Sequence, residues 1–315
     1  MARPRRVAAA LGLALAACVA GCGSPPTADV SSTLQTLAPG VYIHRGPLEE
    51  WGPSNGGDVA NTAVVIGSRC AAVIDSGGTE AVGRQLLAAL RRLTPLPVCY
   101  VINTHAHPDH VFGNAAFAAL QPAPRFVGHR RLPAALAARG PTYLNALRRD
   151  FGTDAAASTR LVAPDLLVED RLELDLGDRR LSLRAWPTAH TDADLSVLDE
   201  ATRTLFLGDL LFVDHAPVVD GRLKGWLAVL DELRGWPVER VLPGHGAPSS
   251  DWPGALDAQQ RYLQTLQADV RRALKDGLTL SQAVARIAPD RPGWRLLDAF
   301  HARNVTAAYA ELEWE

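Results

Sequence analysis

Short apolar runs bounded by turn-forming residues dominate the first third of the chain. Three such runs, rich in β-branched residues, predict strands at 40–46, 61–67 and 71–78. Helical periodicity follows over 79–93, with Thr79 placed to begin a helix. The next apolar run, "PVCYVINTH" at 97–105, predicts another strand. Residues 70–105 therefore predict a strand–helix–strand unit whose two strands are parallel.

The pattern changes character near the middle of the chain. Before that point, "VFGNAAFAAL" (111–120) predicts a helix directly behind a histidine cluster, "RFVGH" (125–129) a strand, and 131–151 a further helix. Residues 166–190 then alternate apolar and polar positions, which is typical of half-exposed antiparallel strands. Two strands, a helix, a strand and a helical C-terminal region continue the series: 195–200, 204–209, 225–236, 238–246 and 251–315.

Strands and helices thus occur in both halves, and polar clusters repeatedly follow the strands. This arrangement predicts a mixed α/β (α+β) fold in which two β-sheets pack together and helices cover the outside. The polar clusters would then meet in one site along the edge that the two sheets share.

The first 39 residues have the composition of an export signal and a tether. The basic start "MARPRR" precedes the apolar run "VAAALGLALAACVAG", which is too short for a membrane span and predicts a signal peptide over 1–21. "VAGC" ends in Cys22 and resembles a lipobox, the bacterial signal for lipid attachment, and 22–39 would be a flexible tether. "LAAC", ending in Cys18, is a second candidate, and a plain secretory signal is the alternative. We expect a periplasmic protein held to a membrane only through a lipid anchor, or a secreted one.

Composition narrows the class of partner. The 315 residues, 47% hydrophobic and 21% charged, suit one large α/β domain or two small ones. Removal of 1–21 takes three arginines from the 32 basic residues and leaves 29 against 34 acidic ones, a net charge of −5. This balance argues against a nucleic-acid-binding surface, which needs a basic face. Cys70 and Cys99 then remain, either as a disulfide in an oxidising compartment or as two separate buried thiols.

The histidine cluster "THAHPDH" (104–110) places four ionisable side chains where an apolar strand ends. Alternate side chains of an extended segment point the same way, so His105, His107 and Asp109 are expected on one side. The chain should turn into a helix at His110 and swing it toward the same space. Imidazole and carboxylate ligands together suit zinc and other borderline divalent metals. The cluster therefore predicts half of a two-metal site.

The other half is expected after later strands, each time beside a glycine or another small residue. "TAHTDADL" offers His190, "LFLGDLLF" offers Asp209, and "LPGHG" offers His245. The simplest assignment gives one metal His105, His107 and His190, and the second metal Asp109, His110 and His245. Asp209 would bridge both. The cofactor predicted from this set is two zinc ions per chain.

These motifs resemble the metallo-β-lactamase superfamily. "HAHPDH", "AH", "GDLLF" and "PGHG" occur in that family's order. The resemblance implies a four-layer αβ/βα sandwich over 40–250, with the helices of 251–315 packed on the same domain. The stretches "AHTDADLSVLD", "GDLLFVDHAPVVDG" and "NVTAAYAELEW" are also similar to the quinoprotein relay system zinc metallohydrolases. That closer resemblance implies a functional link to a pyrroloquinoline-quinone-dependent dehydrogenase.

The activity expected from the metals is hydrolysis by a hydroxide that bridges two zinc ions. Asp109 would orient the hydroxide as well as bind metal, which makes it the catalytic candidate, and Asp75 resembles a residue that supports the ligands in this superfamily. The substrate would be a small ester, lactone, thioester or amide. Four residues are candidates for contact with it: Trp51, His215, Arg222 and Lys224. The histidines outside the ligand set, His44, His129, His215 and His301, are expected not to bind metal.

Three other functions compete with a zinc hydrolase. Persulfide dioxygenases share much of the motif but use one iron ion. Class B β-lactamase activity is weakened by two departures, because the best-known subgroup has a cysteine at the position of Asp209 and no histidine ligand at that of His110. A non-catalytic periplasmic protein that holds a cofactor or a metal is the third, although such a module has little need of an open two-metal site.

Overall fold

The computed structural model describes residue 2 and residues 34–289 and 293–315. The predicted signal peptide and both of its candidate processing sites, Cys18 and Cys22, lie outside the described residues. The first strand, β1 (Gln35–Ala38), pairs with β2 (Val41–His44), and Ala38 is buried in the core. The folded domain therefore begins inside the range 22–39, and the predicted tether is too long at its C-terminal end.

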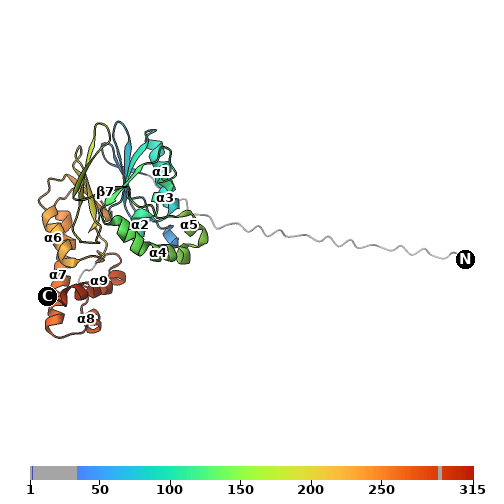
Figure 1. Cartoon of the computed structure of the whole chain (residues 1–315). Helices are drawn as coiled ribbons and strands as arrows, with labels where there is room; N and C mark the ends of the chain where they lie inside the picture. The colour runs from blue at the N-terminus through green and yellow to red at the C-terminus, as the bar shows by residue number, and fades with distance from the viewer. Residues whose placement is uncertain (1, 3–33, 290–292) are drawn as a thin grey trace. The chain divides into compact units, whose positions relative to one another are not determined.

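Seven strands form the first sheet, in their order along the chain (Figure 1). After β1 and β2 come β3 (Thr62–Ile66), β4 (Ala71–Ile74), β5 (Val98–Ile102), β6 (Arg125–His129) and β7 (Leu166–Val168). Neighbours are antiparallel from β1 to β4 and parallel from β4 to β7, as predicted for the pair β4 and β5. The parallel strands direct their C-terminal ends to one edge of the sheet, where the polar clusters follow.

Five strands form the second sheet, in the order β12-β11-β10-β9-β8. Their bounds are β8 (Arg171–Asp175), β9 (Arg180–Ala185), β10 (Leu195–Asp199), β11 (Thr204–Phe212) and β12 (Arg240–His245). Strands β8 to β11 are antiparallel, and β12 joins β11 in parallel. The alternating pattern of 166–190 thus predicts β8 and β9 correctly, whereas β7 belongs to the first sheet and runs parallel to β6.

Helices cover both outer faces of the two sheets. The first sheet carries α1 (Glu80–Leu93) and α3 (Asn114–Phe117), and the second carries α6 (Leu223–Leu233), α7 (Asp257–Lys275) and α9 (Leu297–Leu312) (Figure 1). The other helices are α2 (Pro108–Val111), α4 (Leu132–Phe151), α5 (Thr153–Ser158), α8 (Leu280–Arg286) and the 3₁₀ turns Pro53–Asn55 and Gly254–Leu256. Among the described residues, none of the helices combines the length and apolarity needed to cross a membrane.

The layers follow from where each strand buries its side chains. Ile43, Val65 and Ile74 of the first sheet pack against Leu183 and Val197 of the second in one core between the sheets. Because the strands β3, β4 and β5 also bury their opposite faces under α1 and α3, they read as continuous apolar runs. The second sheet buries its outer face under α6, α7 and α9 in the same way. The four-layer αβ/βα arrangement and the fold class are therefore confirmed.

Two local features of the helices have clear causes. Thr79 begins α1 as predicted, because its hydroxyl accepts a hydrogen bond from the backbone amide of Val82 (3.3 Å), a cap worth about 1 kcal/mol. The helix expected over 111–120 is instead two short helices, α2 and α3, that are separated at Phe112 and Gly113. The first of them starts at Pro108, three residues earlier than predicted, because proline is well suited to the first position of a helix.

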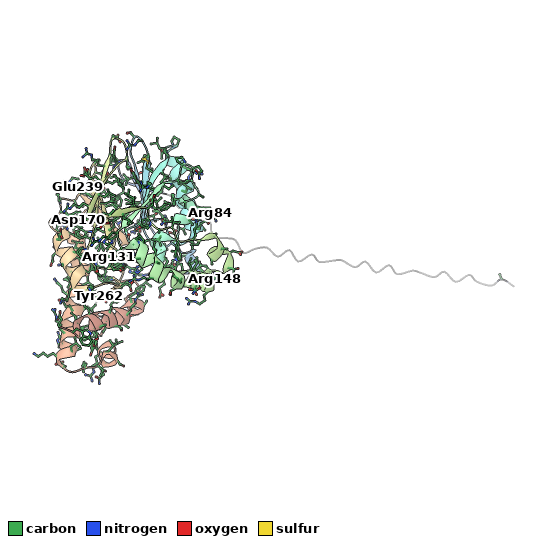
Figure 2. All side chains as sticks on the ribbon, viewed as in Figure 1. Arg84, Arg131, Arg148, Asp170, Glu239 and Tyr262 are labelled. Carbon is green, nitrogen blue, oxygen red and sulfur yellow. A yellow bond between two sulfur atoms is a disulfide. The ribbon has the colours of Figure 1, made fainter. Side chains whose placement is uncertain are left out.

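The C-terminal helices are tied to the second sheet by polar contacts as well as by apolar packing. Tyr262 of α7, which is labelled in Figure 2, is buried, and its hydroxyl meets Nδ1 of His301 (3.0 Å) and Nδ2 of Asn304 (2.9 Å) of α9. Asn304 also accepts a hydrogen bond from the amide of Val219 (2.9 Å) and donates one to the carbonyl of Pro217 (2.7 Å). Helix α9 therefore supports the loop between β11 and α6.

Cys70 and Cys99 form a disulfide, which settles the choice that the sequence left open. The bond joins the residue before β4 to β5, and the two Cα atoms lie 5.8 Å apart. Parallel pairing of β4 with β5 brings the two residues together. The bridge closes a loop with a sequence separation of 29 residues that contains α1.

Candidate metal centre

All seven predicted ligands converge where strands of the two sheets end on the shared edge. They form two groups whose ligand atoms lie within 4.8 Å of one another, a spacing that can hold a metal ion. The first group contains His105, His107, His190 and Asp209, and the second contains Asp109, His110 and His245. This division is the one that we expected from the sequence.

The first group is built around the imidazole of His107. Its Nδ1 atom lies 3.1 Å from Nε2 of His105 and 3.2 Å from Nε2 of His190. Oδ2 of Asp209 completes the group, at 3.6 Å from Nε2 of His105 and 3.5 Å from Nε2 of His190. Three ring nitrogens and one carboxylate oxygen thus face a common point, as the ligands of a tetrahedral zinc site do.

The second group faces the other oxygen of the same carboxylate. Oδ1 of Asp209 lies 3.2 Å from Nε2 of His110 and 3.4 Å from Nε2 of His245. Oδ2 of Asp109 is 3.5 Å from Nε2 of His110 and 3.3 Å from Nε2 of His245. Asp209 therefore directs one oxygen to each group, which is the geometry of a bridging ligand.

Two buried atoms at the centre lack the partner that burial demands. Nε2 of His110 and Oδ1 of Asp209 are buried and make no hydrogen bond, although they lie 3.2 Å apart. A buried polar atom without a partner costs free energy, so such atoms are rare unless a ligand satisfies them. A cation between the two groups would satisfy both atoms at once. The donor set of imidazoles and carboxylates thus fits a pair of divalent metal ions.

The turn after β5 distributes the ligands between the two groups. We expected an extended segment that keeps Asp109 on the side of His105 and His107. Instead, His107 is the last extended residue, and α2 begins at Pro108. The first turn of this helix carries Asp109 and His110 away from His107 and toward His245.

Asp209 lies inside β11, not at its end. Gly208, directly before it, has a left-handed backbone (φ 50°), and the register with β12 shifts on both sides of this glycine. Across the sheet, a Cβ atom at Gly244 would lie 1.9 Å from Oδ1 of Asp209. The carboxylate can therefore reach the space between the groups only because position 244 has no side chain.

Asp75 organises the second group through hydrogen bonds. Its carboxylate accepts hydrogen bonds from the backbone amide (2.8 Å) and the hydroxyl (2.7 Å) of Thr104, and it meets Nδ1 of His110 at 2.8 Å. The residue has a left-handed backbone (φ 54°), a strained conformation that a non-glycine residue adopts where its surroundings enforce it. The supporting role that the resemblance implied for Asp75 agrees with these contacts.

Three further ligand imidazoles, those of His190, His245 and His107, also have a partner at the ring nitrogen that faces away from the ligand groups. Nδ1 of His190 meets the carbonyl of Val218 (2.7 Å), and Nδ1 of His245 meets the carbonyl of Val59 (3.0 Å). Nε2 of His107 meets Oδ2 of Asp220 (3.0 Å). Such partners orient a ring and leave its other nitrogen free to bind metal.

Asp220 is the functional residue that we missed in the sequence. Besides His107, its carboxylate accepts hydrogen bonds from Arg139 of α4 (2.9 Å) and Arg303 of α9 (2.9 Å). Burial opposes its ionisation, but the hydrogen bond from His107 and the charge of Arg139 hold the pKa of Asp220 well below its usual range. The only signal in the sequence was an aspartate before a glycine in "VVDG".

Four of the histidine ligands fall into two classes according to the direction in which the protein shifts their pKa. Burial lowers the pKa of His105 well below its ordinary value and that of His190 to about 3, so both rings are neutral near pH 7. Burial also opposes protonation of His245 and His110. The carboxylate of Asp209, with that of Asp109, outweighs it and raises the pKa of His245 to about 9 and that of His110 well above its usual value. A cation that enters the second group therefore displaces protons.

A cleft of about 300 Å³ opens onto the two groups. Besides His107, Asp109, Asp209 and His245, it is lined by Glu49, Glu50, Trp51, Val59, Pro108, Tyr143, Phe212, His215, Val218, Phe300 and Arg303. Two of the four predicted substrate residues, Trp51 and His215, are in this set. Trp51 is held by a hydrogen bond to the carbonyl of Gly78 (3.1 Å) and by ring contact with Phe151, with centroids 4.6 Å apart.

The other two predicted substrate residues do not line the cleft. Lys224 forms an ion pair with Glu315 (2.7 Å), and Arg222 is the residue that precedes the first turn of α6. Neither belongs to the lining, so their role as cations that hold a substrate stays a prediction. Among the described residues that line the cleft, the only arginine or lysine is Arg303, which comes from α9.

Three of the four histidines that we excluded as ligands lie away from the cleft and have other partners. His44 pairs with Asp58 (2.8 Å), His129 accepts a hydrogen bond from the amide of Arg131 (3.0 Å), and His301 contacts Tyr262. None of them belongs to either group of ligands in the described part of the chain.

The comparisons with known proteins agree with this geometry. Residues 55–245 match the family model described as the metallo-beta-lactamase superfamily. No curated protein sequence matches the chain significantly.

Several solved structures share the fold. The inverting sec-alkylsulfatase Pisa1 from Pseudomonas sp. is 18% identical with a TM-score of 0.69, and the alignment covers 89% of this chain and 50% of that one. The metallo-beta-lactamase family protein TTHA1429 from Thermus thermophilus is 23% identical with a TM-score of 0.64, covering 89% and 94%. A metallo-beta-lactamase from Pontibacter korlensis is 20% identical with a TM-score of 0.59, covering 73% and 98%.

These identities are low enough that the likeness concerns the fold, and the chain spans about half the length of the alkylsulfatase. The family match is more direct, because residues 55–245 make up more than half of the chain and include every predicted ligand. The chain belongs to the metallo-beta-lactamase superfamily.

Proposed function

We propose that this protein is a dinuclear zinc hydrolase that cleaves a small ester, lactone, thioester or amide. The observation that carries the proposal is the position of Asp209, which directs one carboxylate oxygen to each of two adjoining ligand groups at the base of an open cleft. A single-metal site needs only one such group.

The chemistry follows from the arrangement of the side chains. Two zinc ions, when bound, supply a nucleophile derived from water at neutral pH and polarise the bond under attack. His105, His107 and His190 would hold one ion, and Asp109, His110 and His245 the other. Asp109 also lines the cleft, so its carboxylate is placed to orient the attacking water and to receive its proton.

The cleft favours a small substrate that has an apolar part. Trp51, Phe212 and Phe300 contribute aromatic surface close to the ligands, and about 300 Å³ suits a molecule of modest size. The structural neighbours include a sec-alkylsulfatase and metallo-beta-lactamases, so a panel of substrates should contain an alkyl sulfate and a β-lactam beside the esters, lactones, thioesters and amides.

We further propose that the protein is exported, anchored through Cys22 and linked to a quinoprotein dehydrogenase. The disulfide between Cys70 and Cys99 supports export, because such bonds persist in oxidising compartments. The anchor and the link depend on the lipobox and on the closer family resemblance. Metabolic labelling with a fatty acid, compared between the wild type and Cys22→Ser, tests the anchor.

The test of the hydrolase has two steps. Elemental analysis of the purified protein should find about two zinc ions per chain, and the zinc-loaded protein should then hydrolyse at least one class in the panel. Asp109→Ala should lower turnover by about 100-fold or more. Asp165→Ala, which removes a half-exposed carboxylate paired with Arg125, is the control.

Other results would point to the competing functions. One iron ion per chain, with oxygen consumption on a persulfide, would replace the hydrolase with an oxygenase. Two bound zinc ions without turnover of any substrate, together with an Asp109→Ala variant that keeps its biological role, would favour a binding protein.

A further inference from the structure

Arg303 differs from every other cation near the centre, because it lines the cleft and comes from outside the segment that matches the family model. Its side chain is 53% exposed, and it belongs to α9, more than fifty residues after the matched segment ends at residue 245. One nitrogen donates to Oδ1 of Asp220 (2.9 Å). The remaining N–H groups of the guanidinium make no hydrogen bond or ion pair within the described residues. They are therefore available to a ligand in the cleft.

Asp220 holds this guanidinium in place without cancelling the local charge. Its Oδ1 atom is bound by Arg303, and its Oδ2 atom is shared by Arg139 and by Nε2 of His107. Two guanidinium groups therefore face one carboxylate, and the cluster of Arg139, Asp220 and Arg303 has a net charge of +1. Asp220 binds His107 directly, so only the imidazole ring of His107 lies between this charge and the other ligands of the first group.

Neighbouring residues extend the polar side of the cleft next to this cluster. Tyr143 of α4 lines the cleft, and it lies one turn after Arg139 on the same helix. A phenol beside a cation is a good donor to a negatively charged oxygen. The apolar side is formed by Phe300, one turn before Arg303 on α9, together with Phe212 and Trp51.

We propose that Arg303, fixed by Asp220, forms an anion-binding subsite, and that the substrate is a small carboxylate-bearing ester, lactone or amide. The carboxylate lies on Arg303, the apolar part lies against Phe300, and the scissile carbonyl reaches the two ligand groups. This inference rests on the proposed hydrolase function. It assigns to Arg303 the role that the sequence suggested for Arg222 and Lys224, which lie outside the cleft.

Glu49 and Glu50 make it necessary to test which charge on a substrate the cleft prefers. Both carboxylates line the cleft and both side chains are exposed, so their charges are screened by water. A substrate with a cationic group would be drawn to them instead of to Arg303. The two arrangements predict opposite orders of preference for substrates that differ only in charge.

The experiment uses three aryl acetates with the zinc-loaded protein: 4-carboxyphenyl, 4-carbamoylphenyl and 4-(aminomethyl)phenyl acetate. The wild type should prefer the carboxylate. Arg303→Met should lower the ratio of kcat/KM for the carboxylate over the carboxamide by roughly 10-fold to 100-fold, through KM. Arg303→Lys should restore part of the ratio. Dividing the ratio of the wild type by that of each variant removes the intrinsic difference in reactivity between the esters.

A control and a second readout separate this subsite from a general defect. Arg272→Met removes an exposed arginine of α7 that also pairs with one carboxylate, Asp269, and it should leave the ratio unchanged. Calorimetry with 4-hydroxybenzoate and 4-hydroxybenzamide measures the same preference without turnover. The zinc content of Arg303→Met should equal that of the wild type, since Asp220 keeps its contact with His107.

The outcomes distinguish failure of the subsite from failure of the hydrolase. Turnover with equal preference for all three esters, with a preference for the amine, or with the same ratio in Arg303→Met overturns the subsite and leaves the hydrolase standing. No turnover of any ester here or of any class in the wider panel, with a preference for the carboxylate in calorimetry that Arg303→Met abolishes, supports the subsite and contradicts the hydrolase.

Discussion

The segment that matches the family model and the helices that follow it contribute to the cleft in different ways. Residues 55–245 supply all seven predicted ligands, with His245 at the end of the match. Helix α9 supplies Phe300 and Arg303, which line the cleft and belong to neither ligand group. Under the proposed function, the chemistry and the choice of substrate would depend on different parts of the chain, as expected where function is a site added to a common fold.

The alignments with solved structures differ in how much of the C-terminal region they cover. The alignments with Pisa1 and with TTHA1429 cover 89% of this chain, an extent that residues 34–250 cannot supply without the C-terminal helices. The alignment with the Pontibacter korlensis enzyme covers 73%. The fold around the ligands is therefore shared more widely than the full set of C-terminal helices that completes the cleft.

The largest effect is expected in the matched segment, at Asp209. Asp209→Asn keeps the shape of the side chain but removes the charge that both ligand groups share. Loss of an outer partner of a ligand costs about 10-fold to 100-fold in metal affinity, so loss of this shared carboxylate should cost more than about 100-fold, with turnover lost as well. Zinc content after dialysis against a chelator and kcat/KM measure both effects.

The control for this change is Asp269→Asn on α7, a partly exposed carboxylate that pairs with Arg272 far from the ligand groups in sequence. It should retain the zinc content and the turnover of the wild type. An Asp209→Asn protein that keeps two zinc ions and full turnover would show that the two ligand groups do not share a bridging residue.

The disulfide between Cys70 and Cys99 lies within the matched segment and should stabilise it. Replacing both cysteines, with Cys70→Ala and Cys99→Ala, releases a loop with a separation of 29 residues. The free energy of unfolding should fall by about 3–4 kcal/mol, because the unfolded chain regains conformational entropy. Urea unfolding of the variant and of the wild type checks this. Equal stability of both proteins under non-reducing conditions would be incompatible with the disulfide.

Asp220 joins the two parts of the chain, and its replacement should affect one ligand group only. Asp220→Asn weakens the partner of His107 and should lower the metal affinity of the first group by about 10-fold to 100-fold. The second group, which Asp220 does not contact, should keep its affinity. Stepwise titration with zinc or cobalt resolves the two sites. Arg303→Met, which leaves the contact with His107 intact, is the comparison, and equal losses at both sites would argue against a local role.

The smallest effect is expected at Glu315, which helps to hold the C-terminal region. Hydrogen bonds from Arg271 and Lys224 lower the pKa of Glu315 to about 2, below its ordinary value of 4.5. A lowered pKa means that the ionised form stabilises the folded state above pH 4.5 and that this contribution disappears as the pH falls toward 2. Glu315→Gln should therefore be slightly less stable than the wild type at pH 7.

The magnitude should be small because the side chains are exposed to solvent. Thermal unfolding at pH 7, 4 and 2 measures it, and the two proteins should converge at the lowest pH. A difference that grows as the pH falls would contradict the assignment.

The layers and the two ligand groups could be predicted because each depends on a local signal. Apolar runs mark buried strands, and every predicted ligand follows or interrupts such a run in the order that the superfamily shows. The supporting contacts of Asp75 could be expected only from the resemblance. The start of the domain was predicted too late, since β1 is short and its exposed residues look like those of a tether.

The cleft could not be predicted for a physical reason. Tyr143, Asp220 and Arg303 come from two helices and a loop, and their position depends on how these elements pack. Arg222 and Lys224 were favoured because they lie just ahead of a predicted helix, where related β-lactamases place a cation that holds a substrate carboxylate. Packing of α9 instead brings Glu311 to the backbone amide of Leu223 (2.6 Å) and places Arg303 at the cleft.

The hydrogen bonds that Asp75 makes from its left-handed backbone have a consequence for how the site binds an ion. This residue orders Thr104 and His110 through hydrogen bonds that lie entirely within the protein, and Val59, Val218 and Asp220 likewise orient His245, His190 and His107. Because these partners are all groups of the protein itself, we expect folding alone to orient the ligands, in contrast to small domains that remain unstructured until zinc binds. Capture of an ion should then require little rearrangement of the backbone, and a chelator should strip the metal and leave a folded protein.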